Sequence, residues 1–154
     1  MTKIDFKQMP FEELIPHSPP MVLVDNILGY GDDWLEAQIT IKPDTYFFDS
    51  QHQGVASWVA IEYMAQAIAA LAGIRAKSQG QEVKLGFLLG TRKYHIQQPF
   101  LTVNETYNIK VQQLYLDDSG LASFDCSIYQ QDAIFAQAKL NVFETDNKND
   151  VMRG

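Results

Sequence analysis

The segment from Ser57 to Lys77, SWVAIEYMAQAIAALAGIRAK, limits most strongly what this chain can fold into. It is rich in alanine, leucine and methionine, which favour helix, and its apolar residues run almost all the way round the predicted helix. Such a helix must be covered on most of its sides. Glu62 lies in its first turns, and a carboxylate in the hydrocarbon of a membrane is costly. We therefore predict a buried core helix and no membrane span.

The segments that flank this helix are typical of strands. Alternating apolar and polar residues from Leu121 to Tyr129 predict a sheet with one face in water, and turn residues separate the strand-like runs. These runs cover residues 22–30, 34–41, 83–96, 105–116, 121–129 and 133–144. The fold class is therefore α+β, one long helix wrapped by a curved antiparallel sheet. We predict a single domain over residues 1–145 and a disordered polar tail over residues 146–154.

A single curved sheet covers one side of such a helix well and the opposite side poorly. Joining two sheets edge to edge would cover the second side and would also protect an edge strand from unwanted pairing. We therefore expect a dimer.

The charge of the chain is unevenly distributed. A net charge of −7 argues against nucleic acid as the main partner. The window of residues 75–93 holds five basic residues and one acidic residue, which leaves a charge of about −11 for the rest of the chain. The window is either an ordinary solvated surface or a landing site for an acidic partner. In the second case the binding residues are Arg75, Lys77, Arg92 and Lys93.

Several classes of protein are disfavoured by what the sequence lacks. Cys126 is the single cysteine, which excludes an internal disulfide and a site of several thiolates, and its alternating surroundings predict a small buried side chain. The sequence has no metal-ligand spacing and no nucleotide-binding fingerprint, so we expect neither a metal nor a cofactor. The first twenty residues lack an apolar run, which predicts a cytoplasmic protein without a signal peptide.

Two residues are candidates for acid–base chemistry. Glu62 is the one acidic residue between positions 49 and 82, and apolar surroundings favour the protonated form that a general acid needs. The alternative is a structural carboxylate bonded to the backbone or to an arginine. His17 lies between prolines at positions 16 and 19, which stiffen the backbone around its imidazole. Taken alone, a loop histidine is more often an ordinary surface residue.

The start of the helix is a candidate binding site for a developing oxyanion. The backbone N–H groups of Ser57 and Trp58 would point at whatever lies there, and the positive end of the helix dipole would add to their effect. Ser57 is also a candidate N-cap of the helix.

Two segments resemble motifs of the bacterial 3-hydroxyacyl-acyl-carrier-protein dehydratases. Residues 16–25, PHSPPMVLVD, resemble the P-H-R-x-P-F-L-L-V-D motif of that family, and residues 62–66, EYMAQ, resemble the E-x-M-A-Q run on its central helix. Residues 98–105 are weakly similar to its R-P-V-x-P-G-D segment. The resemblance covers roughly residues 12–145. The chain looks most like the divergent branch associated with aryl polyene pigment pathways.

This resemblance implies a hot-dog fold that dimerises with itself or with a related hot-dog subunit, with active sites at the interface. It implies that His17 of one subunit, as the base, faces Glu62 of the other, as the acid. The reaction removes water from a 3-hydroxyacyl thioester, carried by an acyl carrier protein or by coenzyme A, and needs no cofactor. The implied substrate-binding positions are Gly54, Ser57, Trp58, Gln66, Leu89 and Gly90, of which Gln66 supports the site.

The chain also departs from the family pattern. The family has a proline-glycine pair before the helix, and its glycine stands where this chain has Ser57. The stretch of residues 48–57 is several residues shorter than in the family, and no proline lies between positions 43 and 99. Two alternatives therefore stay open. A hot-dog thioesterase would use Glu62 to activate water and would not need His17, and a non-catalytic subunit would pair with an active dehydratase.

Overall fold

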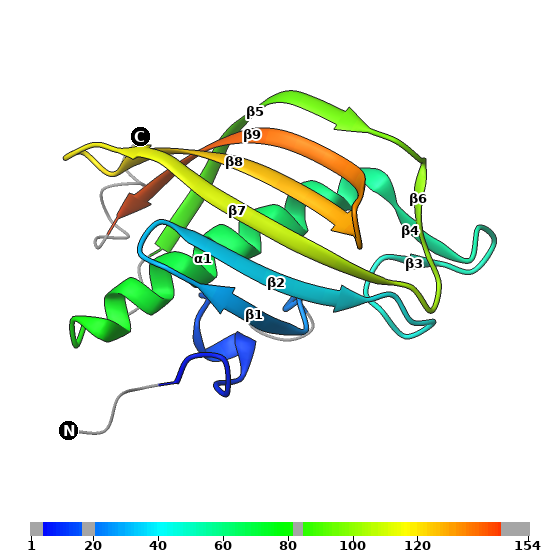
Figure 1. The fold of residues 1–154 in the computed structure, drawn as a ribbon, viewed down its shortest axis with the longest axis horizontal. Helices are drawn as coiled ribbons and strands as arrows, with labels where there is room; N and C mark the ends of the chain where they lie inside the picture. The colour runs from blue at the N-terminus through cyan, green and yellow to red at the C-terminus, as the bar shows by residue number, and fades with distance from the viewer. Residues whose placement is uncertain (1–4, 17–20, 82–84, 146–154) are drawn as a thin grey trace.

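The computed structural model places one long helix on one face of a curved antiparallel sheet (Figure 1). It describes residues 5–16, 21–81 and 85–145, so His17 and the tail 146–154 lie outside the described residues. Helix α1 spans Ala60–Ser78 and follows directly on a 3-10 turn, η2, at Ser57–Val59. The α+β architecture of a hot-dog fold is therefore confirmed.

The main sheet has six strands in the order β1-β2-β7-β8-β9-β5, and all neighbours are antiparallel. Strand β5 follows the helix in sequence but lies at the edge of the sheet, beside β9. The bounds are β1 Asn26–Tyr30, β2 Trp34–Thr40, β5 Leu85–Ile96, β7 Thr106–Leu116, β8 Leu121–Gln130 and β9 Ala133–Thr145. A short 3-10 turn, η1, at Phe11–Glu13 precedes them.

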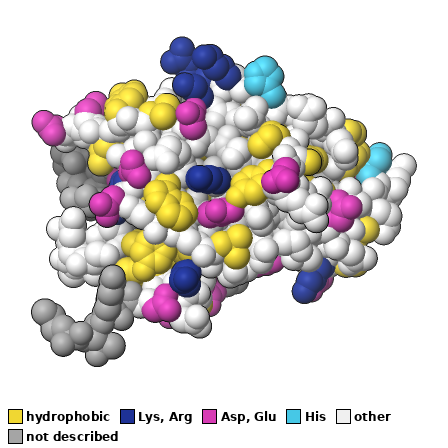
Figure 2. All heavy atoms as spheres, viewed as in Figure 1, with side chains coloured by type: hydrophobic (Ala, Val, Ile, Leu, Met, Phe, Trp, Pro, Cys, Tyr) yellow, Lys and Arg dark blue, Asp and Glu magenta, His cyan; other side chains and the backbone are white. Residues whose placement is uncertain are grey.

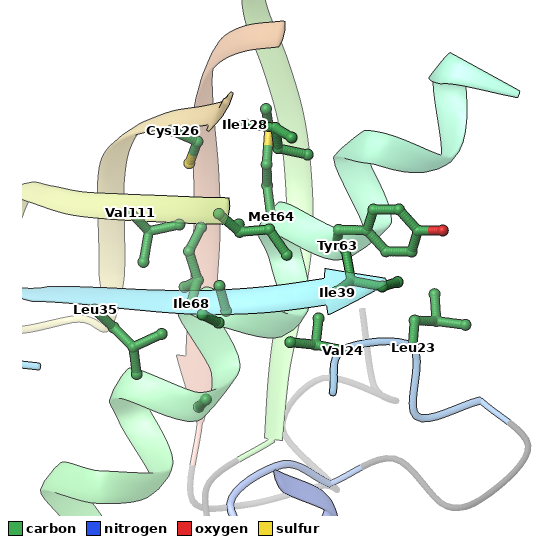
Figure 3. Close-up of a cluster of buried hydrophobic side chains, with 14 of the residues drawn as sticks. Leu23, Val24, Leu35, Ile39, Tyr63, Met64, Ile68, Val111, Cys126 and Ile128 are labelled. Carbon is green, nitrogen blue, oxygen red and sulfur yellow. The ribbon is translucent and has the colours of Figure 1, made fainter. Parts of the chain in front are cut away.

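The core lies between α1 and the inner face of this sheet. Figure 3 shows Leu35 from β2, Val111 from β7 and Ile128 from β8 converging on Met64 and Ile68 of the helix. Each large aliphatic side chain that is fully buried in this way contributes about 1.5–3 kcal/mol. The alternation of buried and exposed positions in the strands therefore places one face of each strand against α1.

Two predictions about buried residues are confirmed. Cys126 is 5% exposed, and its burial raises the pKa of the thiol, as expected for a packing residue. The helical segment Ser57–Ser78 is long and apolar enough to cross a membrane, yet 72% of its most apolar window is buried inside the fold. It is therefore the core helix that the sequence predicts.

A second, three-stranded sheet lies at the N-terminal end of α1 (Figure 1). It pairs β3 (Phe48–Asp49), β4 (Gly54–Ala56) and β6 (Phe100–Thr102), which are not among the strands that the sequence predicts. Strands of two or three residues show no alternation that a sequence could reveal. Gly54 allows the close approach of β4 to β6, because an added Cβ would overlap the carbonyl oxygen of Leu101.

Strand β1 begins at Asn26, four residues later than the predicted start at residue 22. The reason is a side chain from the helix. The amide of Leu23 donates to Gln66 of α1, so this residue is bound to the helix, and the bonds to β2 begin at Asp25, whose amide donates to the carbonyl oxygen of Gln38 at 3.0 Å.

Candidate functional site

Glu62 lies in the first turn of α1, on a side that the sheet does not cover. Its neighbours Tyr63 and Met64 are fully buried, whereas Glu62, Ile61 and Ala65 are partly exposed. Glu62 is thus less buried than the sequence suggests. Its carboxylate has no hydrogen-bond or ion-pair partner in the described part of the chain, so the alternative of a bonded structural carboxylate finds no support there. The Glu62 carboxylate can therefore interact with a bound molecule or with a second subunit.

Gln66 lies one turn after Glu62 and is only 1% exposed. Its Nε2 donates to the carbonyl oxygen of Met21 at 2.5 Å, and its Oε1 accepts from the amide of Leu23 at 2.8 Å. The segment that directly follows residues 17–20 is therefore fastened to the helix turn beside Glu62. Leu14, on the other flank of residues 17–20, is also fully buried. The two flanks of the His17 segment are thus anchored, although His17 itself lies outside the described residues.

The backbone at the start of the helix is fixed by two bonds to Ser57. Its N–H donates to the carbonyl oxygen of Pro99 at 2.8 Å, and its carbonyl accepts from the hydroxyl of Tyr94 at 2.6 Å. The prediction that Ser57 caps the helix is wrong, because η2 begins after Ala56 and neither η2 nor α1 has a side-chain cap. The Ser57 N–H, one of the two predicted oxyanion donors, is therefore already bonded to Pro99. The other predicted donor, the Trp58 N–H, has no acceptor among the described residues.

The predicted substrate-binding positions fall into two groups. Gly54, Ser57 and Gln66 are buried, whereas Trp58 is 58% exposed and Leu89 is 59% exposed. Leu89 and Gly90 lie at a register shift in the edge strand β5, and no atom lies within contact distance of a Cβ added at Gly90. Large apolar side chains that are exposed in this way indicate a surface for another molecule.

The predicted basic window is divided by the fold. Arg75 at the C-terminal end of α1 donates to the carbonyl oxygen of Asp32 through Nε and Nη2, and to Gln113 Oε1 at 2.6 Å. Arg75 thus joins the β1–β2 turn to β7, which is a structural role. Lys77 is partly buried near the same end of the helix. Arg92 and Lys93 are exposed on β5 instead.

Basic residues distant in sequence join Lys93 on the outer face of the sheet. Lys93, Lys110 and Lys139 line one depression there, and Lys139 forms an ion pair with Asp125 at 3.6 Å. The sequence pattern missed Lys110 and Lys139 because only the strand pairing brings them together. Figure 2 shows basic side chains at separate places on this face, interspersed with acidic ones.

Histidine and acidic side chains are potential metal ligands. His52 Nδ1 lies 2.8 Å from Asp49 Oδ2 beside the small sheet, and His95 is exposed on β5. Within the described residues, no three His, Cys, Asp or Glu side chains are grouped so that they could hold a metal ion.

The chain matches the family model described as ApeP-like, ApeP dehydratase, over residues 9–153. No curated protein matches it. Among solved structures it is similar to the dehydratase heterocomplex ApeI:P from Xenorhabdus doucetiae, with 29% identity and a TM-score of 0.88. That match covers 94% of this chain and 96% of the other.

More distant structures share the fold. A hypothetical thioesterase with coenzyme A from Streptococcus pneumoniae has 11% identity and a TM-score of 0.60, with 77% of this chain and 84% of that chain covered. The PaaI protein from the phenylacetic acid degradation operon of E. coli has 14% identity and a TM-score of 0.58, with 76% and 80% covered. At such identities the likeness shows the fold alone.

Proposed function

Because this chain belongs to the ApeP-like dehydratase family, we propose that it converts a 3-hydroxyacyl thioester to the trans-2-enoyl thioester with His17 as base and Glu62 as acid. The observation that carries the proposal is the pair of hydrogen bonds made by Gln66. They hold residues 21–23, which follow the His17 segment, against the helix turn of Glu62, whose carboxylate has no partner among the described residues. The described backbone of residues 21–23 is thereby tied to the helix turn that carries Glu62, which supports the proposal that the two candidate groups act together.

The chemistry uses each group in turn. A thioester carbonyl acidifies the C2 protons, and neutral His17 removes one of them. Negative charge collects on the carbonyl oxygen, where the Trp58 amide and the positive end of α1 stabilise it. The electron pair then forms the C2–C3 double bond while the C3–O bond breaks. Glu62, in its protonated form, gives its proton to the departing hydroxyl, which leaves as water.

A second hot-dog subunit completes the proposed site. The similar structure from Xenorhabdus doucetiae is a dehydratase heterocomplex, and in this chain one side of the first turns of α1 is uncovered. Strand β5 is an edge of the sheet and carries the exposed side chain of Leu89. We propose that a related subunit, or a second copy, pairs along β5 and covers Glu62.

We further propose that an acyl carrier protein delivers the substrate, in polyene-type or fatty acid synthesis in the cytoplasm. Arg92 and Lys93 are the exposed basic residues of the predicted window, whereas Arg75 is held by Asp32 and Gln113. Charge reversal at Arg92 or Lys93 should therefore weaken use of carrier-bound substrate and spare short pantetheine substrates.

The reaction itself is tested by its products. The purified chain, alone and with a related hot-dog subunit, is incubated with a 3-hydroxyacyl thioester, and enoyl thioester and free thiol are measured. Enoyl thioester without thiol supports the proposal. Release of thiol supports the thioesterase alternative. If neither product depends on this chain's own residues, the chain is a non-catalytic subunit.

Substitutions of the two proposed catalytic residues sharpen this test. His17→Ala and Glu62→Gln should each lower kcat/KM for dehydration by about 10²–10⁴-fold, the scale of general acid–base catalysis. The double variant should be little worse than either single one, because residues that act in one step are not additive. Asp125→Asn, which removes an exposed carboxylate from the outer face of the sheet, is the matched control. A His17→Ala variant that keeps half of its activity contradicts the mechanism.

A further inference from the structure

Three exposed aromatic side chains form a continuous surface at the N-terminal end of the helix. Tyr46 is 44%, Phe47 is 37% and Trp58 is 58% exposed. The ring centroids of Tyr46 and Phe47 are 4.5 Å apart, with an interplanar angle of 71°, and those of Phe47 and Trp58 are 5.6 Å apart at 70°. This chain of edge-to-face contacts, which we call the aromatic wall, is a favourable arrangement of aromatic rings.

The backbone that carries the aromatic wall is held in place. Phe47 has a φ of 72°, a left-handed conformation that is strained for a bulky side chain. Two backbone hydrogen bonds close the turns around Phe47. The Thr45 amide donates to the Lys42 carbonyl oxygen at 2.9 Å, and the Phe48 amide donates to the Thr45 carbonyl oxygen at 3.0 Å. Strain that is maintained at an exposed side chain adds little to the core. It is typical of a surface that is ordered in advance for a ligand.

The aromatic wall lies beside the proposed acid. Trp58 precedes Glu62 by four residues in the continuous helical segment of η2 and α1, so both side chains lie on the same side, about one turn apart. Backbone motion at Trp58 is restricted, because its neighbour Ser57 is bonded to Pro99 and Tyr94. A substrate whose C3 hydroxyl reaches Glu62 would therefore place adjoining atoms near Trp58.

The chemistry of the aromatic wall favours the acyl chain over the carrier arm. The phosphopantetheine arm carries amide groups that need hydrogen-bond partners, and the exposed ring faces supply few of these. A hydrocarbon chain has no such need. A flat conjugated chain gains further, because its π face can stack on an indole ring and it has fewer torsions to immobilise than a saturated chain.

Resting on the proposed function, we propose that Trp58, supported by Phe47 and Tyr46, is a specificity-determining residue. It favours acyl chains that are flat and conjugated beyond C3 over saturated chains of the same length. The step beyond the dehydratase assignment is that this selection is made by the aromatic wall at the start of the helix, and not by the core between α1 and the sheet.

The test measures binding and does not depend on turnover. The probes are two unreactive amide analogues of an acyl pantetheine, one with a conjugated dienoyl chain and one with a saturated chain of equal length. Calorimetric titration is done on the full chain in the assembly in which it purifies. Trp58→Leu should lower the affinity for the conjugated analogue by about fivefold to tenfold, the value of one aromatic contact, and change that for the saturated analogue by less than about twofold. Phe47→Leu should give a smaller loss in the same direction.

Tyr115→Leu is the matched control, because Tyr115 is 50% exposed near the far end of β7 and should affect neither analogue. Equal losses for both analogues in Trp58→Leu would overturn the proposal, as would no loss for either. If Trp58→Leu reduces the mass of the assembly measured by light scattering, the proposal is overturned, because Trp58 would then be a contact between subunits. If the chain prefers the conjugated analogue through Trp58 but catalyses no dehydration, the dehydratase mechanism is rejected and the specificity inference stands. A dehydratase whose preference ignores Trp58 would reject this inference alone.

Discussion

The two halves of α1 differ in how completely the chain covers them. From Ala70 to Ile74 every residue is buried, whereas Ile61, Glu62 and Ala65 in the first half are partly exposed. In Figure 1 the first half lies beside the small sheet and the second half extends to the opposite end of the molecule. The enclosed stretch Ala70–Ile74 carries packing residues, whereas the partly open first turns carry Glu62 and follow directly on Trp58 of the aromatic wall.

This difference has a local cause. The N-terminal segment packs directly on the second half of the helix, where the carbonyl of Leu14 lies against Gly73. At the first half, Gln66 holds the backbone of residues 21–23 by hydrogen bonds, and one side of the helix stays uncovered. Stability should therefore be most sensitive to the second half, and catalysis to the first.

The largest expected effect on stability is at Gly73. An added Cβ would overlap the backbone carbonyl of Leu14, which cannot move aside like a flexible side chain. Gly73→Ala should lower the free energy of unfolding by about 3 kcal/mol, the upper part of the usual range for overpacking. This outweighs the gain in helix propensity of about 1 kcal/mol. Urea unfolding measures it, with Gly90→Ala as the control, since space is open at Gly90. A neutral Gly73→Ala would show that the second half is not tightly closed.

Gln66 should affect both stability and catalysis. Gln66→Leu removes both hydrogen bonds and leaves the buried amide of Leu23 without its acceptor, which should cost about 1–3 kcal/mol. The dehydration rate should fall as well, because the segment next to His17 is released. Gln66→Glu is the informative comparison, since it keeps the acceptor for Leu23 and loses the donor to Met21. Unchanged rates in an unstable Gln66→Leu variant would limit Gln66 to a structural role.

Tyr63 should show an effect of the opposite sign. The Tyr63 side chain is fully buried, and its hydroxyl has no hydrogen-bond partner among the residues that the structure describes. Burial together with the nearby Asp25 raises the pKa of the phenol. Tyr63→Phe removes an unsatisfied polar atom and should raise the free energy of unfolding by about 1 kcal/mol. Chemical denaturation of the full chain tests this. A loss of stability would show that the hydroxyl is bonded in solution.

The smallest expected effect is a pH dependence at the small sheet. The hydrogen bond from His52 lowers the pKa of Asp49 below its ordinary value of 3.8. The unfolded chain then binds this proton more readily than the folded chain, so the pair stabilises the fold above pH 3.8 and this contribution is lost as the pH falls through the lower folded pKa. Asp49→Asn should therefore be less stable than the wild type near neutral pH, and the difference should shrink in acid. A difference that is equal at all pH values would contradict this.

Regular periodicity accounts for the parts of the fold that the sequence predicted well. The helix over residues 57–77, the long strands after it and the burial of Cys126 follow from which residues are apolar and how they are spaced. The acid–base candidates His17 and Glu62 came from local residue types and from motif resemblance. These features depend on interactions between residues that are close along the chain, or on the repeat of a whole element.

Only the tertiary structure decided the features that join distant segments. The pairing of β4 with β6, the bonds from Gln66 to the backbone of residues 21–23, and the contact of Gly73 with Leu14 each link residues more than forty positions apart. The role of Arg75, which looked like a free surface charge, depends on Asp32 and Gln113 in the same way. The sequence by itself determined which residues are apolar, titratable or turn-forming. Which of them meet is set by chain topology, because contacts between such distant segments leave no local pattern for a sequence to show.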